Sequence, residues 1–587
     1  MSAKNLKITP YTPQSEFPDD FKATSATSLL CIHCNYEVDW LKKSSLTDHL
    51  KSKKHFACKL SFSATVQSSL QDTLNKIDKR QQIIYDFVEM MAICNIPLEK
   101  KDKMTEWLQK YVPNSGSIPT ANTLRKNYLL KVLETHKEQI KEKIKDQPLS
   151  AIIDSSPDRL SRNVVNTIVS CGISGERFLL ETRFITTVDN INLYHVIDNV
   201  RQDYSIQWKY IDTLVCDSAS YNKKLYKTIK EGINPNIKLM RCWTHLLDLV
   251  SDTWQDSNLN SHIHIVISKF QHLLNKSSVR KSRYIQFLRD QGHNNPRIMP
   301  TMVLTRWNSW YRVIEYLAEF LPLIKSFLLK EKREQENSEL VNAVLEILND
   351  PTRFSETQLV VQFIYERARV FYEIIEEFEK SQGITHQAYN KIMNLYNHLR
   401  FTKYSDELGE IMDRIIEDNE LNGSYWQFEF KKLYGEALIK LESLIKEHEM
   451  WSFLKAVRVF DPKQLSSVSK NISDYIDVIP GLDFTNSALK KEFLTYIQIE
   501  KNIENAQNPI DFWTTFGNNC PTLSKVAIRA LNIPVNSVDV ERSFSMYRDI
   551  LSDQRTSLKL ASINSLSMIN YNYKINMNKD NDIDIDE

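Results

Sequence analysis

The sequence predicts an α/β protein in which a sheet-containing domain is split by a large helical insertion. Three short β-branched runs, "LSAIIDSSPD", "NVVNTIVSCGIS" and "GERFLLETRFITT", indicate three strands in meander order. A helix, a strand ("IDTLVCDSAS"), a second helix and a fifth strand ("NIKLMRCWTH") then alternate. From about residue 310 to about residue 510 the periodicity is helical. Three antiparallel strands followed by helix, strand, helix and strand is the order of an RNase H-like fold.

Length and composition indicate a soluble, intracellular protein of about three or four domains. The chain has 587 residues, is 42% hydrophobic and contains only 11 glycines, which favours a largely helical structure. No run of eighteen apolar residues is present, and the N-terminus lacks the apolar stretch of a signal peptide, so we expect no membrane partner. Six of the eight cysteines are scattered singly, a pattern without a disulfide framework.

A zinc finger is predicted near the N-terminus by the stretch "LLCIHCNYEVDWLKKSSLTDHLKSKKH". Cys31 and Cys34 are separated by two residues, and His49 and His55 by five. Two thiolates and two imidazoles complete the closed tetrahedral shell of a structural zinc site, and a domain this small needs its metal to fold. We expect the histidines on one face of a helix that begins near Ser44 or Ser45. His33 is a competing ligand, and four unrelated residues are the plain alternative.

Lysines around this finger suggest a polyanion partner. The first 150 residues carry 23 Lys and Arg against 17 Asp and Glu, while the whole chain has a net charge of +1. Lysines supply phosphate contacts that are independent of sequence, which suits DNA as the partner, although similar modules also bind RNA or protein. The lysines closest to the histidines, and therefore the candidate DNA contacts, are Lys51, Lys53 and Lys54. Residues 68–146 then indicate helices of a connector, with Thr120 as a cap.

Two aspartates end apolar runs on strands that should be neighbours. Asp154 follows "AII" on the first strand and Asp217 follows "LVC" on the fourth. Adjacent carboxylates repel one another unless a cation lies between them, and Mg²⁺ prefers oxygen ligands. Each aspartate alone is more often a strand-end turn residue. Asp158, in a turn after Pro157, and Asp212, at the start of the fourth strand, are the weaker alternatives.

A third acid, Glu541, lies on a short helix near the C-terminus, in "SVDVERSFSMYRDIL". An apolar stripe runs along this helix, with Glu541 at its edge; the stripe consists of Val540, Phe544, Tyr547 and Leu551. The glutamate can therefore reach the rim of a sheet and complete a site able to hold two metal ions for phosphoryl transfer. A glutamate at a helix boundary without a function is the alternative.

Several of these motifs resemble those of the hAT superfamily of transposases. The C-terminal stretch "SVDVERSFSMYRDILSDQRTSL" resembles the family's signature, and "IIDSSPD", "CDSASY" and "CWTHLLDLV" resemble its core motifs in the same order. The finger with "HLKSKKH", together with "NIPLEK" and "IPTANTLRKNYL", resembles the group of the CGG triplet repeat-binding protein. The resemblance spans about residues 27–575.

The resemblance implies a set of site residues and cofactors. Asp154, Asp217 and Glu541 would be the acidic triad and bind Mg²⁺ or Mn²⁺. His245 would lie near the scissile phosphate, and Cys242 is its partner in the family's CxxH motif. In "TRWNSWYRV", Trp307, beside Arg306, would stack on a flipped base, although most tryptophans belong to a core. Zn²⁺ would be structural, in the finger.

The leading functional hypothesis is a nuclear DNA transposase that forms dimers or higher oligomers and acts on transposon ends and a target in double-stranded DNA. A domesticated DNA-binding or regulatory protein without catalysis is the runner-up. An RNase H-like nuclease is a third interpretation, which leaves the finger and the insertion unexplained. The expected segments are: a disordered N-terminus, 1–23; a BED or Cys2His2-like finger, 24–60; a helical DNA-binding or connector region, 61–146; the first part of the RNase H-like core, 147–309; an all-helical insertion, 310–525; the C-terminal core helices with the dimerisation region, 526–575; and an acidic tail, 576–587.

Overall fold

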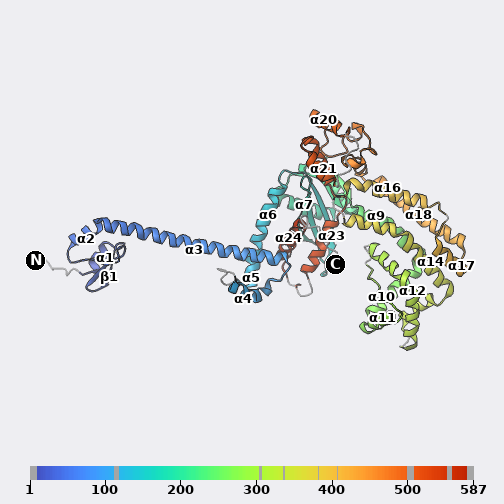
Figure 1. The fold of residues 1–587 in the computed structure, drawn as a ribbon, viewed down its shortest axis with the longest axis horizontal. Helices are drawn as coiled ribbons and strands as arrows, with labels where there is room; N and C mark the ends of the chain where they lie inside the picture. The colour runs from blue at the N-terminus through green and yellow to red at the C-terminus, as the bar shows by residue number, and fades with distance from the viewer. Residues whose placement is uncertain are drawn as a thin grey trace. The chain divides into compact units, whose positions relative to one another are not determined.

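A computed structural model describes residues 9–111, 118–302, 307–334, 338–380, 383–405, 407–498, 508–551, 555 and 558–577. The chain divides into two compact units, residues 1–132 and 133–587 (Figure 1). No described helix combines the length and the apolar character that a membrane crossing requires. The acidic tail lies outside the described residues from residue 578 onward.

The first unit begins with a small three-stranded sheet beside helices. Strand β2 pairs antiparallel with both β1 and β3. Phe21, Leu29 and Leu46 form a core with Cys31, and Leu50 packs against it. Within the segment 1–23, expected to be disordered, residues 11–16 form a helix and residues 21–23 begin a strand. The elements are α1 (Tyr11–Glu16), β1 (Phe21–Ser25), β2 (Ser28–Cys31), β3 (Tyr36–Glu37), α2 (Lys43–Lys51) and α3 (Lys53–Ile93).

Helices form the rest of this unit, as the sequence predicted. Thr120 caps a helix start by accepting a hydrogen bond from the Thr123 amide at 3.3 Å. Val88 and Met91 at the end of α3 and Leu124 are buried, so apolar periodicity drives the packing here. The elements are η1 (Leu98–Lys100), α4 (Lys101–Tyr111), α5 (Ala121–Thr123), η2 (Leu124–Leu129) and α6 (Leu130–Ile144), which crosses into the second unit.

The second unit contains a five-stranded mixed sheet with the order β6-β5-β4-β7-β8. The first three strands pair antiparallel, while β4, β7 and β8 pair in parallel, so the predicted meander and the predicted pairing of the first and fourth strands are both confirmed. Strand β5 is buried on both faces, as expected of a strand inside a sheet covered by helices. The strands are β4 (Leu149–Pro157), β5 (Asn163–Cys171), β6 (Arg177–Ile185), β7 (Ile211–Cys216) and β8 (Lys238–Arg241).

Helices from both ends of the chain cover this sheet. Helix α23 packs on β4 and β5, and α24 packs on β6, which brings the C-terminal segment (red) beside the strands (teal) in Figure 1. Asn572 on α24 accepts a hydrogen bond from the Leu179 amide at 2.7 Å and donates one to the Leu179 carbonyl at 3.0 Å. These bonds satisfy backbone groups that an edge strand leaves open. The helices are α7 (Asn190–Asp203), α8 (Ser220–Gly232), α9 (Trp243–Gln255), α23 (Val538–Ile550) and α24 (Leu560–Met577), with η3 at Trp208–Tyr210.

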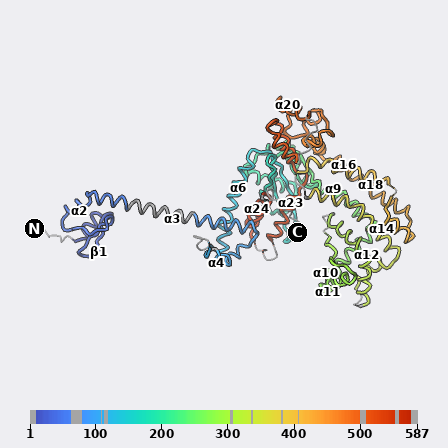
Figure 2. Tube along the Cα trace, viewed as in Figure 1, coloured from blue at the N-terminus to red at the C-terminus, as the bar shows by residue number. Residues whose placement is uncertain are grey.

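Between α9 and α23 the described chain is helical and contains no strand, which agrees with the expected insertion (Figure 2). Trp310 is fully buried in its core. Helix α18 packs against both α9 and α16, so the insertion is anchored on the helix that follows β8. The elements are η4 (Asn258–Asn260), α10 (Ser261–Asn275), α11 (Ser278–Asp290), α12 (Trp307–Glu334), α13 (Glu339–Leu348), α14 (Pro351–Arg367), α15 (Arg369–Lys380), α16 (Thr385–Thr402), α17 (Glu410–Asp418), α18 (Gly423–Glu447), α19 (Trp451–Ala456), η5 (Val457–Phe460), η6 (Pro462–Gln464), η7 (Ile472–Asp474), α20 (Ser487–Tyr496), α21 (Pro509–Phe516) and α22 (Pro521–Leu531).

Candidate metal centre and acidic pocket

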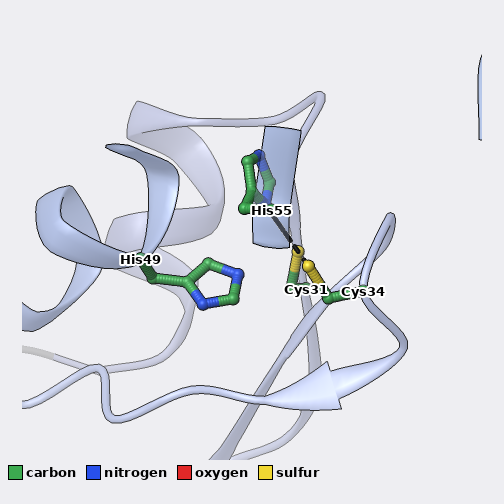
Figure 3. Close-up of side chains that lie close together, drawn as sticks. All are labelled: Cys31, Cys34, His49 and His55. Atoms are coloured by element: carbon green, nitrogen blue, oxygen red, sulfur yellow. Dashed lines mark hydrogen bonds between the residues drawn. The ribbon is translucent and has the colours of Figure 1, made fainter. Parts of the chain in front are cut away.

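The four predicted finger ligands lie together (Figure 3). One ligand atom from each of Cys31, Cys34, His49 and His55 lies within 4.8 Å of all the others. The Nδ1 atom of His55 is 3.4 Å from the Cys31 sulfur and 3.5 Å from the Cys34 sulfur. Two sulfur and two nitrogen donors at this spacing suit a tetrahedral ion, and zinc is the common ion for that donor set.

The helical geometry of the histidine pair differs from the prediction of one continuous helix. His49 lies on α2 and His55 on α3, with a break at Ser52. The Ser52 side chain caps α3 by accepting a hydrogen bond from the His55 amide at 3.0 Å. The spacing explains the break, because residues six positions apart on one α-helix point about 120° away from each other at 100° per residue. The break turns both imidazoles toward the sulfurs.

An acidic residue that the motif did not indicate, Asp20, lies behind the cluster. Its Oδ1 atom is 3.4 Å from Nε2 of His55, 3.3 Å from Nε2 of His33 and 2.7 Å from Nζ of Lys59. Burial alone would raise the pKa of Asp20. The hydrogen bond from Lys59 and the charges of Lys59, His55 and His33 outweigh this effect, so the pKa lies below its ordinary value and the carboxylate is ionised. His55 thus directs one nitrogen at the sulfurs and the other at a carboxylate, the arrangement that fixes a metal-binding tautomer.

The two predicted strand-end acids stand near the carboxyl ends of neighbouring parallel strands. Ile152 on β4 pairs with Val215 on β7 in a parallel register, and Asp154 and Asp217 each stand two residues beyond that pair. Parallel strands bring their carboxyl ends to one edge, so both side chains reach the same edge. The Oδ1 atom of Asp217 accepts hydrogen bonds from the Ala219 amide at 2.8 Å and from Nδ2 of Asn222 at 2.7 Å.

Helix α23 brings Glu541 to the face on which Asp154 lies. Asp154 is directly opposite Asn166 of β5, so their side chains share one face of the sheet. Asn166 donates a hydrogen bond to Ser543 of α23 at 2.6 Å, so α23 covers that face. The predicted apolar stripe of α23 is confirmed, because its four residues are buried, and Glu541 at its edge remains 19% exposed.

A pocket of about 140 Å³ lies where these elements meet. Nε2 of His245, near the start of α9, is 3.9 Å from Oε1 of Glu541. Cys242, just before α9, accepts a hydrogen bond from the Ser537 amide at 3.2 Å and therefore ties the start of α9 to the start of α23. The lining residues are Asp154, Ser155, Ser156, Thr244, His245, Asp248, Glu379, Glu541, Phe544 and Arg548. Asp217 is not among them.

Burial and neighbouring charges shift the pKa values of the groups in this pocket. Burial raises the pKa of Asp154 to about 7, with further increases from the Asp217 and Glu541 carboxylates, while His245 opposes the shift. The Cys242 sulfur, followed by Glu541 and Asp154, raises the pKa of His245 to about 11 despite burial. In its protonated form, His245 would offset the charge of Glu541 and Asp154. Among the described residues, the finger cluster is the one group of His, Cys, Asp and Glu spaced closely enough to hold a metal ion as it stands.

The alternative aspartates have structural partners elsewhere. Asp158 accepts hydrogen bonds from Arg162 at 2.8 Å and from the Tyr547 hydroxyl at 2.9 Å, and Asp212 accepts one from Arg529 at 2.7 Å. Arg306 lies outside the described residues. Trp307 begins α12, but its side chain is also outside the described part of the structure.

Comparison with known proteins links both ends of the chain to families. The model of the hAT family C-terminal dimerisation region matches residues 492–573, the CGGBP1 N-terminal domain matches 4–61, and the CGGBP1 helical domain matches 75–131. CGG triplet repeat-binding protein 1 of Homo sapiens is 34% identical over 134 residues, which covers 21% of this chain and 80% of that protein. The Mus musculus protein matches to the same extent. The chain belongs to the family of the CGG triplet repeat-binding proteins through its N-terminal region, and it carries a hAT family C-terminal dimerisation region.

The hAT dimerisation region of this chain includes α21 to α24. It carries both Glu541 and the Asn572 contact to β6, so part of the region is packed within the fold of one chain. Sequence reasoning missed Asp248 and Glu379, which line the same pocket. Asp248 lies three residues after His245, one helical turn away, and that spacing was the available signal. Glu379 had no such signal, because only the fold of the insertion brings it to the pocket.

Proposed function

We propose that this protein is a hAT-superfamily DNA transposase that cleaves and transfers DNA strands by metal-dependent phosphoryl transfer. The observation that carries the proposal is the approach of Asp154, Glu541 and His245 to one pocket, with Asp217 at the end of the neighbouring parallel strand. These groups come from three separate parts of the chain. Together with the mixed sheet of order β6-β5-β4-β7-β8, their approach supports a catalytic centre in a proposed RNase H-like domain over a coincidence of surface acids.

In this proposal the three acids, Asp154, Asp217 and Glu541, would hold Mg²⁺ or Mn²⁺. Their oxygen atoms are the donors that these ions prefer. Burial is the main cause of the raised pKa of Asp154, and the Asp217 and Glu541 carboxylates raise it further. The metal, when bound, activates water or a 3′ hydroxyl and stabilises the leaving oxygen. His245, cationic beside Glu541, would hold the scissile phosphate through a charge-assisted hydrogen bond.

The N-terminal region is proposed to bind DNA through a finger stabilised by zinc on Cys31, Cys34, His49 and His55. The relatives matched there are named for binding CGG triplet repeats. Lys51, Lys53 and Lys54 are exposed beside the cluster and would contact phosphates. We also propose that the chain self-associates through parts of its hAT dimerisation region and acts in the nucleus, where double-stranded DNA is its partner.

A domesticated DNA-binding protein without catalysis is the second candidate. The spacing of the acids favours it, since they are not close enough to hold a metal ion as they stand. The similarity to CGG triplet repeat-binding proteins, which covers most of their length, also favours it. Under this alternative the acidic pocket is a remnant of the fold, and DNA binding by the N-terminal region is the whole activity.

A strand-cleavage assay distinguishes the two candidates. The zinc-loaded full chain is incubated with duplex DNA that carries the sequences flanking its gene, with Mg²⁺ or Mn²⁺, and nicked products are separated on denaturing gels. The transposase proposal requires metal-dependent nicks that disappear in Glu541→Gln and persist in Glu181→Gln, a matched change at a half-buried glutamate of β6. Retained DNA binding with no cleavage by the unmodified chain would establish the domesticated alternative.

A further inference from the structure

A second cavity, of about 270 Å³, lies at the opposite end of the sheet from the acidic pocket. Leu149 of β4 lies opposite Cys171 at the end of β5, whereas Asp154 lies opposite Asn166 nearer the other end of that strand. The cavity is enclosed by the turn between β5 and β6, by the start of α16, by the N-terminus of α21 and by the segment between α22 and α23. Arg177 is the one charged residue among those that line it.

Two buried hydrogen-bond donors in this cavity lack partners. Ser170 at the end of β5 and Arg177 at the start of β6 are directly opposite in register, so their side chains lie on the same face of the sheet. Ser170 is 1% exposed and Arg177 is 9% exposed. Neither Oγ of Ser170 nor Nε of Arg177 has a hydrogen-bond partner in the described part of the structure. Buried donors without partners are rare, and each calls for an acceptor.

The charge around this pair is positive. Nη1 of Arg177 forms an ion pair with the buried carboxylate of Asp539, at the start of α23. Nη1 of Arg542 is 3.2 Å from the other oxygen of the same carboxylate. Two guanidinium groups therefore share one carboxylate, and no acidic residue lines the cavity itself. The excess charge belongs to Arg542, whose side chain is 33% exposed, and it adds positive potential beside a cavity that no acid lines.

We propose that this cavity is a binding site for a small anion with carboxylate or phosphate oxygens, held by Nε of Arg177 and Oγ of Ser170. Both donors are fixed by their strands, and a guanidinium edge matches the geometry of either oxyanion. The volume suits a small ligand, below the range of about 300–1,000 Å³ that is common for drug-sized molecules. The site is independent of the proposed strand transfer, and its ligand need not be DNA.

Titration of the zinc-loaded full chain with inorganic phosphate and with acetate, at constant ionic strength, tests this proposal by calorimetry. Ser170→Ala removes one neutral donor and is expected to weaken binding about three- to tenfold. Arg177→Lys keeps the positive charge beside Asp539 but removes the Nε donor, and is expected to weaken binding at least as much. Ser251→Ala is the matched control, because Ser251 is equally buried on α9 but has its partner, the Leu247 carbonyl at 3.1 Å.

Thermal melts establish that each variant is folded before its titration is interpreted. Saturable binding of phosphate alone indicates a phosphoryl ligand, and binding of acetate alone or of both indicates a carboxylate-compatible site. The lysines of the finger also attract anions, so only the component that Ser170→Ala or Arg177→Lys weakens counts in support. Binding that both folded variants retain unchanged, or no saturable binding of either anion, would overturn the proposal.

Discussion

Oε1 of Glu541 lies 3.9 Å from Nε2 of His245, although the two residues belong to parts of the chain separated by the whole helical insertion. His245 stands in the first turn of α9, directly after the sheet, and Glu541 in the first turn of α23. Cys242 ties these two helix starts together through the Ser537 amide. The insertion is therefore compatible with a continuous site, because both of its flanks return to the same sheet edge.

Removal of the charge of Glu541 should abolish strand cleavage while DNA binding survives. Glu541→Gln keeps the shape and packing of the side chain but removes a metal ligand, so cleavage is expected to fall on the order of a thousandfold or more. Asp154→Asn and Asp217→Asn should behave alike, and a double variant should lose little more than a single one, because the three acids act as a unit. Additive losses across the double variants would contradict a shared metal site.

Zinc affinity should depend on Asp20 although it is not a ligand. Asp20→Asn removes the carboxylate behind His55 and is expected to weaken zinc binding roughly ten- to a hundredfold, measured by competition with a chromogenic chelator. The chain should bind about one zinc ion, and Cys31→Ser with Cys34→Ser should unfold the finger. His33→Gln is the control for ligand identity. If it removed zinc as completely as His55→Gln does, His33 would be the ligand.

Salt should weaken DNA binding by the N-terminal region through its exposed lysines. Each phosphate contact contributes about 0.9 to the slope of log affinity against log salt concentration. Lys53→Gln combined with Lys54→Gln should therefore reduce that slope by up to about 1.8 in filter binding or fluorescence anisotropy. The same double change at Lys490 and Lys491, exposed on α20, is the matched control. Equal slopes in all three proteins would indicate that the finger lysines do not contact DNA.

Substitution of Trp307 should impair the reaction with DNA, whereas substitution of Trp310 should lower the stability of the fold. Loss of a base-stacking platform in Trp307→Ala removes about 1–3 kcal/mol of stacking per base and should impair hairpin formation with little change in melting temperature. Trp310 is fully buried, so Trp310→Ala should lower the free energy of unfolding by about 3–5 kcal/mol. A large drop in melting temperature for Trp307→Ala would place its ring in the core instead.

Acid should destabilise the second unit through His448. This buried imidazole stacks on Trp243, accepts a hydrogen bond from the Met450 amide at 3.2 Å on Nδ1, and places Nε2 3.2 Å from the Arg241 carbonyl. One acceptor and one donor require the neutral ring, and burial lowers the pKa of His448 to about 3. Because the unfolded chain binds this proton near pH 6.5, stability is full above that pH and is lost as pH falls toward 3.

The loss attributable to His448 should approach about 1.4 kcal/mol per pH unit between these two values. Denaturant unfolding at pH 7, 6, 5 and 4 measures it, and His448→Gln should lower stability at pH 7 but reduce the slope below pH 6.5. Asp154 changes the free energy of unfolding in the opposite direction. Because its pKa is raised to about 7 in the folded state, its contribution to stability is lost as pH rises from about 4 to about 7. A slope unchanged by His448→Gln would show that the ring is already protonated in the folded state.

The sequence by itself determined the elements and the chemistry of the ligands. Residue type and spacing predict a metal site at Cys31, Cys34, His49 and His55. The β-branched runs, such as those that end at Asp154 and Asp217, predict the strands in their observed order. These are local properties, set by the few side chains around each residue. The apolar stripe beside Glu541 is also a local property, because it follows from the spacing of residues along one helix.

Only the tertiary structure decided which of these residues meet. Asp20 stands behind His55 because the residue just before β1 contacts the first turns of α3, and Glu379 reaches the acidic pocket because the insertion returns to the sheet. The same holds for Ser170 and Arg177, whose lack of partners depends on how α22 and α23 close over β5 and β6. The burial of a side chain, its hydrogen-bond partners and the compensation of its charge result from contacts between distant segments. The periodicity of one segment does not indicate which other segment it will contact.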